Sequence, residues 1–458
     1  MTICNSFLSK NHQLQAISDL KNSNDLPFNE VLSQNKIAQY LKVDGSRERH
    51  FSPEVTLWAF LSQVMDDDQS QQAAVSRVIA SAISREKKPP SANTSAYSQA
   101  RSRLSENGLS DLTRDTAKKM KEDIPPEWLW RDLNIKLVDG STLSMPDTPE
   151  NQATYPQPDS QNPGIGFPIA RIVAIIDYLT GAVLDLAIGQ YSGKKTGEHA
   201  LLRQLMSSFD ERDVMLGDCY YPSFFLMAML MQLGISGVFP MHASRKYDFR
   251  RGKRLGKKDH LVGWKRPKKP EWMEQADYDS FPSEISMREV SIETKRPGFR
   301  VQKRILVTTF LDPVKVEKSD LADLYDCRWF VELALRSIKD TMHMGILRGK
   351  TPDMVRKEIW VHLLAYNLIR KIMAQAAWLH GKKATELSFK LALQMVKAFQ
   401  QAGVFNKGSP DTYTKLFEVI VYKKVGNRPG RQEPRCVKRR PKAFSKLQKP
   451  RGSYKNAA

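Results

Sequence analysis

The first quarter of the chain carries hydrophobic residues at helical spacing. Ser52-Pro53-Glu54 is a typical helix start, with an N-cap serine and a proline in the first turn. The apolar residues that follow are Val55, Leu57, Trp58, Phe60 and Leu61. We therefore predict a helical N-terminal domain over residues 1–125.

From residue 131 the pattern changes to short apolar runs that are rich in β-branched residues. These runs cover residues 133–138, 169–176, 182–188, 214–216 and 235–239, with helical patterns near 197–208 and 223–233 between the later ones. Tyr178-Leu179-Thr180-Gly181 has the composition of a hairpin turn. Three consecutive strands followed by alternating helices and strands predict a ribonuclease H-like order, although periodicity alone supports only a mixed α/β fold.

The alternation stops after residue 240. Residues 241–312 are basic, contain prolines and include alternating apolar runs, so we predict a β-rich insertion there. Helical patterns return over residues 319–342, 351–379 and 386–400. The predicted regions after the N-terminal domain are a core over 126–240, the insertion over 241–312, a core helix within 313–345, a helical region over 346–421 and an extended tail over 422–458.

Excess positive charge is confined to two segments. The formal net charge is +21, from 71 Lys and Arg against 50 Asp and Glu. Residues 245–270 contain twelve basic and two acidic residues, and residues 423–458 contain thirteen basic residues and one acidic residue. This distribution is typical of a protein that binds a polyanion, with nucleic acid as the leading partner. The alternative is two solvated loops, and lipid is disfavoured because neither segment has an apolar helical face.

Composition and cysteine spacing narrow the class of protein. With 41% hydrophobic residues the chain can form an ordinary globular core, and no apolar run approaches the ~18 residues of a membrane-spanning helix. The first residues lack the order of a secretion signal. Four cysteines without a CxxC pair form neither a disulfide framework nor a zinc knuckle. We expect a cytoplasmic protein with no membrane association.

Two aspartates directly follow apolar, strand-like runs. Asp139 stands in Leu137-Val138-Asp139-Gly140-Ser141, and Asp218 stands in Met215-Leu216-Gly217-Asp218-Cys219. A carboxylate at the end of a buried strand is held rigidly at the rim of a sheet, where hard cations are often bound. Each aspartate alone also fits a turn former or a helix cap.

A third group of polar residues occupies the helical pattern near residue 330. Tyr325, Arg328, Glu332 and Lys339 project within an arc of about 60° if the helix is regular at about 100° per residue. Arg336 lies close to the same face. The alternative interpretation is an exposed stripe of ion pairs at i,i+4 spacing.

The spacing Tyr325-x2-Arg328-x3-Glu332-x6-Lys339 resembles the Y-x2-R-x3-E-x6-K signature of the insertion sequence four family of bacterial DDE transposases. The surroundings of Asp139 and Asp218 are similar to the first and second acidic motifs of that family, in the same order. The resemblance extends from about residue 15 to 450. It implies a ribonuclease H-like catalytic core with a β-rich insertion between the second and third acidic residues.

The resemblance also implies the chemistry. Asp139, Asp218 and Glu332 would hold two Mg²⁺ ions, with Mn²⁺ as a substitute, to cut double-stranded DNA at transposon ends and join the freed 3′-OH to the opposite strand or to target DNA. Arg328 and Lys339 would bind phosphates beside the cut, Tyr325 would donate to a phosphate, and Arg336 lies close by. Each subunit of a homodimer on DNA would bind one end and cut the other.

Further DNA contacts are expected in the two basic segments. The candidates are Lys253, Arg254 and Trp264 in the insertion and Lys438, Arg439 and Arg440 in the tail. Trp264 and Trp272 are candidates for stacking on a displaced base, against the alternative of ordinary core packing. Two other classes of function remain open: a catalytically inactive DNA-binding relative, and a nuclease of the same fold that only hydrolyses. A scaffold protein is disfavoured by the clustered phosphate-binding residues.

Overall fold

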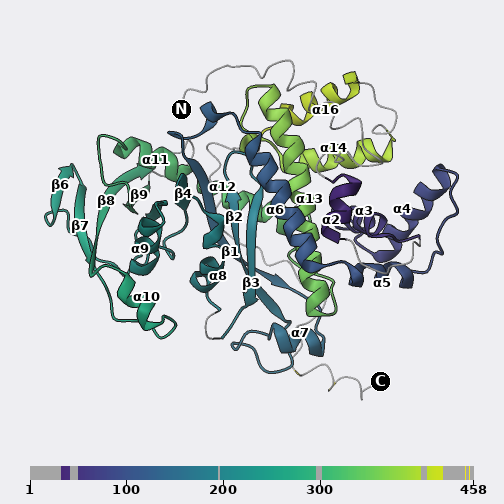
Figure 1. Cartoon of the computed structure of the whole chain (residues 1–458), viewed down its shortest axis with the longest axis horizontal. Helices are drawn as coiled ribbons and strands as arrows, with labels where there is room; N and C mark the ends of the chain where they lie inside the picture. The colour runs from purple at the N-terminus through teal and green to yellow at the C-terminus, as the bar shows by residue number, and fades with distance from the viewer. Residues whose placement is uncertain are drawn as a thin grey trace. The chain divides into compact units, whose positions relative to one another are not determined.

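The computed structural model describes residues 32–41, 50–193, 196–294, 302–403 and 410–425, together with residues 449 and 453. The chain divides into two compact units, whose elements are labelled in Figure 1. We call residues 1–129, 176–185 and 333–426 the helical unit, and residues 130–175, 186–332 and 427–458 the sheet unit. Nearly all of the predicted basic tail lies outside the described residues.

A nine-stranded mixed sheet has the strand order β3-β2-β1-β4-β5-β9-β8-β7-β6. β1, β4 and β5 run parallel, and the strands from β5 through β9, β8 and β7 to β6 pair antiparallel. The strands are β1 (Asn134–Ser144), β2 (Ile169–Asp177), β3 (Val183–Gln190), β4 (Asp213–Leu216), β5 (Ser236–Pro240), β6 (Lys253–Gly256), β7 (Asp259–Lys265), β8 (Glu284–Thr294) and β9 (Gln302–Thr308). The five strands predicted between residues 133 and 239 are thus present.

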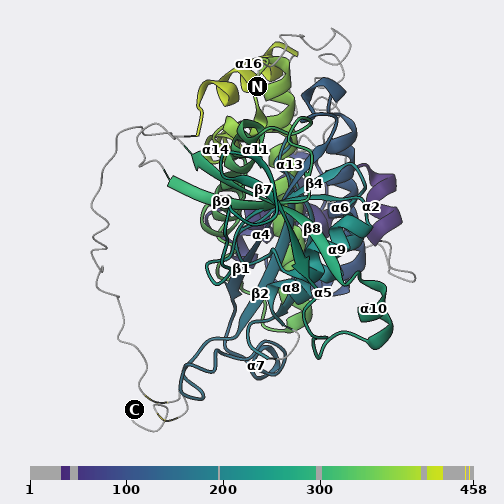
Figure 2. The same cartoon turned by 90° about the vertical axis from the view of Figure 1, so that its left-hand side faces the viewer.

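The predicted insertion contributes four strands to the same sheet. β9 pairs with β5, with Phe239 opposite Val307, and Figure 2 shows β7, β8 and β9 side by side. Arg288 on β8 donates to both carboxylate oxygens of Asp259 on β7, at 2.9 and 2.6 Å, and both side chains are buried. Because a buried charge is tolerated only when it is paired, this ion pair fixes the register of the two strands.

Most helices of the sheet unit lie between its strands in the chain order, and the last two follow β9. They are α7 (Pro149–Thr154), α8 (Glu198–Gln204), α9 (Phe224–Gln232), α10 (Gln275–Ser280), α11 (Lys318–Asp326) and the start of α12 (Trp329–Arg336). The side chain of Ser223 caps α9 by accepting from the backbone of Leu226. The cap therefore fixes the end of the short segment between β4 and α9. Asp218 lies in this segment.

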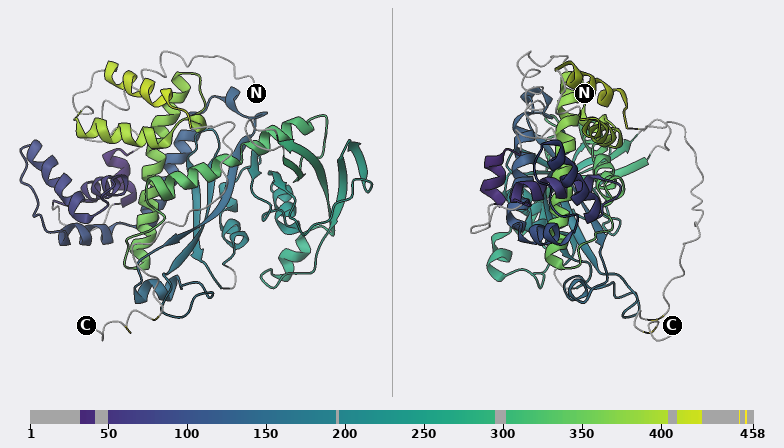
Figure 3. Two further views of the ribbon diagram at one scale, coloured as in Figure 1. Left: turned by 180° about the vertical axis from the view of Figure 1, so that it is seen from behind. Right: turned by 90° about the vertical axis from the view of Figure 1, so that its right-hand side faces the viewer.

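The helical unit combines segments from both ends of the chain. It contains α2 (Gln34–Leu41), α3 (Pro53–Met65), α4 (Gln71–Ser84), α5 (Ser95–Arg103), α6 (Glu106–Glu122), α13 (Pro352–Leu379), α14 (Phe389–Gln401) and α16 (Pro410–Tyr422). Figure 3 shows α13 as its longest helix, and α13 packs against α6, α3, α14 and α16. Within the described residues, no helix is apolar over a length that could span a membrane.

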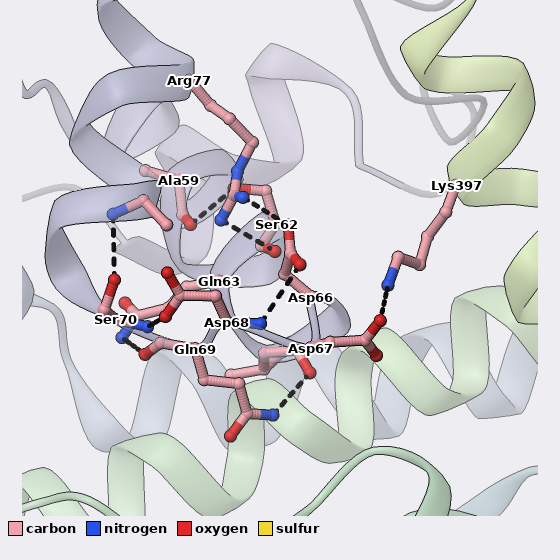
Figure 4. A network of polar contacts seen from close by, with 12 residues as sticks. Ala59, Ser62, Gln63, Asp66, Asp67, Asp68, Gln69, Ser70, Arg77 and Lys397 are labelled. Atoms are coloured by element: carbon pink, nitrogen blue, oxygen red, sulfur yellow. Dashed lines mark hydrogen bonds and ion pairs between the residues drawn. The ribbon is translucent and has the colours of Figure 1, made fainter.

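The corner between α3 and α4 is held by polar contacts rather than by apolar packing alone. Arg77 of α4 pairs with Asp66 and donates to the hydroxyl of Ser62, while Lys397 of α14 pairs with Asp67 (Figure 4). The side chain of Ser70 caps α4. These contacts fix the acidic turn after α3 within the helical unit.

Candidate active site

Asp139 lies within β1, not at its end as the sequence predicted. β1 continues to Ser144, and the Oδ1 atom of Asp139 accepts from the backbone N–H of Gly140 at 2.9 Å. Burial raises the pKa of Asp139 to about 6, opposed by that hydrogen bond and by the charge of Arg328. The charges of Asp218 and Glu198 raise the pKa further. Asp139 therefore sits among other carboxylates in a partly dry environment.

Asp218 lies two residues after β4, as predicted for a residue following a strand. Leu137 of β1 is aligned with Leu216 of β4, and Asp139 and Asp218 each lie two residues further on. The Oδ1 atom of Asp218 accepts from the backbone N–H of Tyr220 at 2.8 Å, which shapes the loop that carries it. Parallel register thus brings the first two predicted acidic residues to corresponding positions.

Glu332 lies on α12 and is paired with Arg328. The Nη2 atom of Arg328 donates to the Oε1 atom of Glu332 at 2.6 Å. Burial lowers the pKa of Arg328, but Tyr325, Glu332 and Asp139 raise it and the net shift is upward. The charges of Glu332 and Asp139 thus both favour the charged form of Arg328. In the part of the chain that the structure describes, no three His, Cys, Asp or Glu side chains are gathered closely enough to hold a metal ion.

The single helix predicted over residues 319–342 is wrong. α11 ends at Asp326, and a turn at Cys327 and Arg328 precedes α12. Backbone bonds in this turn have the shorter i,i+3 spacing, and residues Ser337–Thr341 form a π-helix. The prediction that these side chains share one face assumed a regular α-helix. The turn and the π-helix each interrupt that regularity. Arg336 and Lys339 belong to the helical unit, and their predicted DNA contacts stay predictions.

Tyr325 is buried, and its hydroxyl has a protein partner. The Nη1 atom of Arg304 on β9 donates to the Tyr325 hydroxyl at 3.1 Å. The guanidinium carbons of Arg304 and Arg328 lie 5.6 and 5.9 Å from the centre of the Tyr325 ring. The sequence interpretation missed Arg304, because a single basic residue in a strand carries no motif.

Glu198, which the sequence interpretation missed, lies at the start of α8 beside His199. The Oε2 atom of Glu198 accepts from the hydroxyl of Tyr221 at 3.2 Å, and the Nε2 atom of His199 lies 2.9 Å from the backbone oxygen of Tyr220. A β-carbon at Gly140 would overlap the Glu198 carboxylate. Burial raises the pKa of Glu198, and the charge of Asp218 raises it further, opposed by the Tyr221 hydroxyl. Glu198 thus touches the segments that carry both aspartates.

The predicted basic residues of the insertion are split between surface and interior. Lys253 and Arg254 are exposed on β6, the outermost strand of the sheet. Trp264 is buried, its Nε1 atom donates to Glu289 at 3.0 Å, and the guanidinium of Arg245 lies 3.5 Å from its ring centre. This environment is that of a packing residue. The predicted Lys438, Arg439 and Arg440 lie outside the described residues.

Replacing Trp264 by phenylalanine is expected to destabilise the sheet unit without changing DNA binding. The change removes a hydrogen bond to the buried carboxylate of Glu289, for which we expect a loss of about 1–3 kcal/mol. Thermal unfolding would measure the loss and a salt titration of DNA binding would measure affinity. Replacing the half-buried Trp128, which lies outside the basic insertion, by phenylalanine is the control. A variant with normal stability and weakened DNA binding would instead identify Trp264 as a base-stacking residue.

Comparison with known proteins adds the family. A model of the transposase DDE domain matches residues 130–368. The transposase InsG for insertion sequence element IS4 of Escherichia coli strain K12 is 28% identical over 408 residues, covering 86% of this chain and 87% of that relative. The putative transposase InsL for insertion sequence element IS186A of the same strain is 33% identical over 96 residues, which are 19% of this chain and 26% of that relative.

One solved structure gives a weaker likeness. The piggyBac transposase in a synaptic complex with hairpin DNA covers 94% of this chain and 86% of its own, with a TM-score of 0.42 and 10% identity. A TM-score this low does not identify a common fold. The matched DDE domain, by contrast, spans more than half of the chain and includes Asp139, Asp218 and Glu332. The chain therefore belongs to the DDE transposases, and it is similar over most of its length to a transposase of insertion sequence element IS4.

Proposed function

We propose that this transposase binds the terminal inverted repeats of an insertion sequence and cuts and joins DNA there, with Asp139, Asp218 and Glu332 as its metal-binding carboxylates. The observation that carries the proposal is the register of β1 against β4, which gives Asp139 on β1 and Asp218, two residues after the end of β4, corresponding positions. Carboxylates on rigid, adjacent elements suit a hard cation. The strand order β3-β2-β1-β4-β5 supports a ribonuclease H-like core.

The donor set fits Mg²⁺, with Mn²⁺ as a substitute, because it consists of carboxylate oxygens alone. Asp139, Asp218 and Glu332 would together hold the ions. The raised pKa of Asp139 supports this assignment, since burial beside like charges is the environment that a bound cation would neutralise. Such ions activate the attacking oxygen and stabilise the leaving oxygen in phosphodiester chemistry.

Arg328 is the residue that DNA would redirect. Its guanidinium is mostly buried and donates to Glu332. A phosphate, although tetrahedral, offers two oxygen acceptors that a guanidinium can bind bidentately, as it binds a carboxylate. If a DNA phosphate took the guanidinium, the Glu332 carboxylate would lose this ion pair and could serve as a metal ligand. Tyr325 and Arg304 would hold the Arg328 side chain in place during this exchange.

The DNA surface of the sheet unit would include the exposed basic residues of β6. Lys253 and Arg254 lie on an edge strand whose basic side chains also discourage pairing with other strands. Lys339, Arg336 and the basic residues of the tail would add further phosphate contacts. Because two ends must be cut together, the active form would be a homodimer on DNA.

Replacing Glu332 by glutamine tests the proposal. We expect cleavage at the inverted termini of a plasmid carrying the gene with its flanking DNA to be lost, on the order of 10³-fold, because the change removes a metal-binding charge. Binding to the termini is expected to stay within a few fold of wild type, since Arg328 remains. Sequencing would map the liberated ends, and EDTA provides the metal-free control. The exposed Glu211 changed to glutamine is the matched control.

The outcomes separate the alternatives. Precise cutting by the wild type that the Glu332 variant lacks, with joining of the 3′-OH to new DNA, supports transposition. Cutting without joining would identify a nuclease that only hydrolyses. Tight, salt-sensitive binding of the termini without any cutting by the wild type would identify an inactive DNA-binding relative.

A further inference from the structure

We infer that Glu198 is a positioning residue that ties the loop carrying Asp218 to the strand carrying Asp139. Glu198 is the first residue of α8 and belongs to neither predicted acidic motif. The inference rests on the proposed function, because it assumes that Asp139 and Asp218 act together. It adds a residue that sets the distance between them.

The contact of Glu198 with β1 is a close one. Gly140 directly follows Asp139, and a β-carbon on it would overlap the Glu198 carboxylate. Only glycine leaves room for this carboxylate to lie against the backbone of β1. The contact therefore places Glu198 beside the peptide that carries Asp139, at a point where β1 is rigid.

The contact of Glu198 with the second aspartate runs through Tyr221. This tyrosine is completely buried, and its hydroxyl donates to Glu198 Oε2 at 3.2 Å. A β-carbon at Gly217 would lie 2.8 Å from the Tyr221 ring, so the ring packs directly on the residue before Asp218. The buried side chain of Tyr221 thus packs on the start of the loop from Gly217 to Tyr221, and this loop carries Asp218.

His199 provides a second tie from α8 to the same loop. Its Nε2 atom lies 2.9 Å from the backbone oxygen of Tyr220 and donates to it, since a carbonyl can only accept. The His199 ring lies 5.0 and 5.8 Å from the ring centres of Tyr220 and Tyr221. Two consecutive residues of α8 therefore hold two consecutive residues of the loop, and Glu198 alone also reaches β1.

A positioning role and a charge role for Glu198 predict different effects of replacing it by glutamine. Glutamine keeps an oxygen that accepts from Tyr221 and has nearly the same shape, whereas alanine keeps neither. If Glu198 positions the loop, glutamine preserves function and alanine does not. If Glu198 acts through its charge near the cations, glutamine fails as well. Tyr221 changed to phenylalanine removes the same hydrogen bond from its other end.

The experiment compares Glu198→Gln, Glu198→Ala and Tyr221→Phe with wild type and with the exposed control Glu211→Ala. Hydrogen–deuterium exchange of residues 217–222 reports the loop without requiring activity. Titration with Mn²⁺, followed by loss of the free-ion electron paramagnetic resonance signal, reports metal affinity. Cleavage of terminal DNA at varied Mg²⁺ concentrations reports function.

We expect Glu198→Ala and Tyr221→Phe to speed exchange in the loop and to weaken Mn²⁺ binding and cleavage by about 10–100-fold, the usual effect of removing a residue that orients a metal ligand. Glu198→Gln is expected to stay within about threefold of wild type. The double variant Glu198→Ala, Tyr221→Phe should show little more loss than either single variant, because both single changes remove the same hydrogen bond.

Two results would overturn the inference: wild-type exchange and metal affinity in Glu198→Ala, or a loss in Glu198→Gln equal to that in Glu198→Ala. Failure of the proposed function is recognised separately, because the wild type itself would then show neither metal-dependent cleavage nor Mn²⁺ binding. Loop exchange would still test the contact between Glu198 and Tyr221 in that case.

Discussion

Replacing Asp139 by asparagine is expected to abolish cleavage and to raise thermal stability at alkaline pH. Cleavage should fall on the order of 10³-fold or more, because the shared carboxylate is lost from a site whose catalysis is electrostatic. Stability should rise because the folded chain buries the Asp139 charge beside those of Asp218 and Glu198. Asparagine has similar size and carries no charge.

The pH dependence of this stability difference follows from the direction in which the pKa of Asp139 is shifted. The pKa of Asp139 in the folded chain is about 6, above its ordinary value of 3.8, so the folded state holds the proton more tightly than the unfolded state. Protonation therefore contributes stability that is full below about pH 4, is lost as pH rises to about 6, and is absent above that. The variant has no carboxyl group at this position, so it should lose less stability than wild type in this window.

Unfolding midpoints of wild type and variant, measured in EDTA at pH 4.5 and pH 8, give the test. The advantage of the variant should be larger at pH 8. Asp159→Asn, an exposed aspartate in the same unit, is the matched control and should show no such change. An Asp139 variant that is less stable than wild type at pH 8, or one that still cleaves DNA, would contradict the assignment.

Local sequence was enough to place two of the predicted acidic residues beside strands. Asp139 and Asp218 each follow an apolar run, and the strands form where those runs lie. The pairing of Arg328 with Glu332 is likewise a local i,i+4 contact. The break between α11 and α12 was not predictable in the same way, because Cys327 and Arg328 are ordinary helix residues with no glycine or proline beside them.

Contacts between distant segments account for what the sequence did not reveal. Glu198 meets Gly140 and Tyr221, and Arg304 meets Tyr325, only because strand order and loop geometry bring them together. No periodic pattern in the sequence indicates such contacts between distant residues. The extension of the central sheet by β6 to β9 is a similar case, since alternation predicts strands but not their partners.

Buried charge also misleads a sequence interpretation of α13. Lys357 and Glu358 lie inside the helical unit, although charged residues at these positions suggest an exposed face. Lys357 donates to the backbone oxygen of Ser102, and Glu358 accepts from the backbone of Arg348 and Gly349. Polar partners supplied by other segments make this burial tolerable, and the sequence gives no sign of them.

The same helix makes the contact for which we expect the largest effect on stability. Asn367 of α13 accepts from the backbone N–H of Val183 at 2.8 Å and donates to its backbone oxygen at 2.9 Å, and both residues are fully buried. β3 is an edge strand of the sheet. The amide of Asn367 therefore takes the place that a neighbouring strand would occupy at Val183.

Replacing Asn367 by leucine should lower the free energy of unfolding by about 2–4 kcal/mol, because leucine has nearly the same volume but leaves two buried backbone groups without partners. Urea unfolding followed by far-ultraviolet circular dichroism would measure the loss. Asn107→Leu, at an exposed position of α6, is the matched control and should change stability by less than about 0.5 kcal/mol. Equal stabilities of the two variants would mean that Val183 gains other partners when Asn367 is lost, and that α13 does not protect the edge of the sheet.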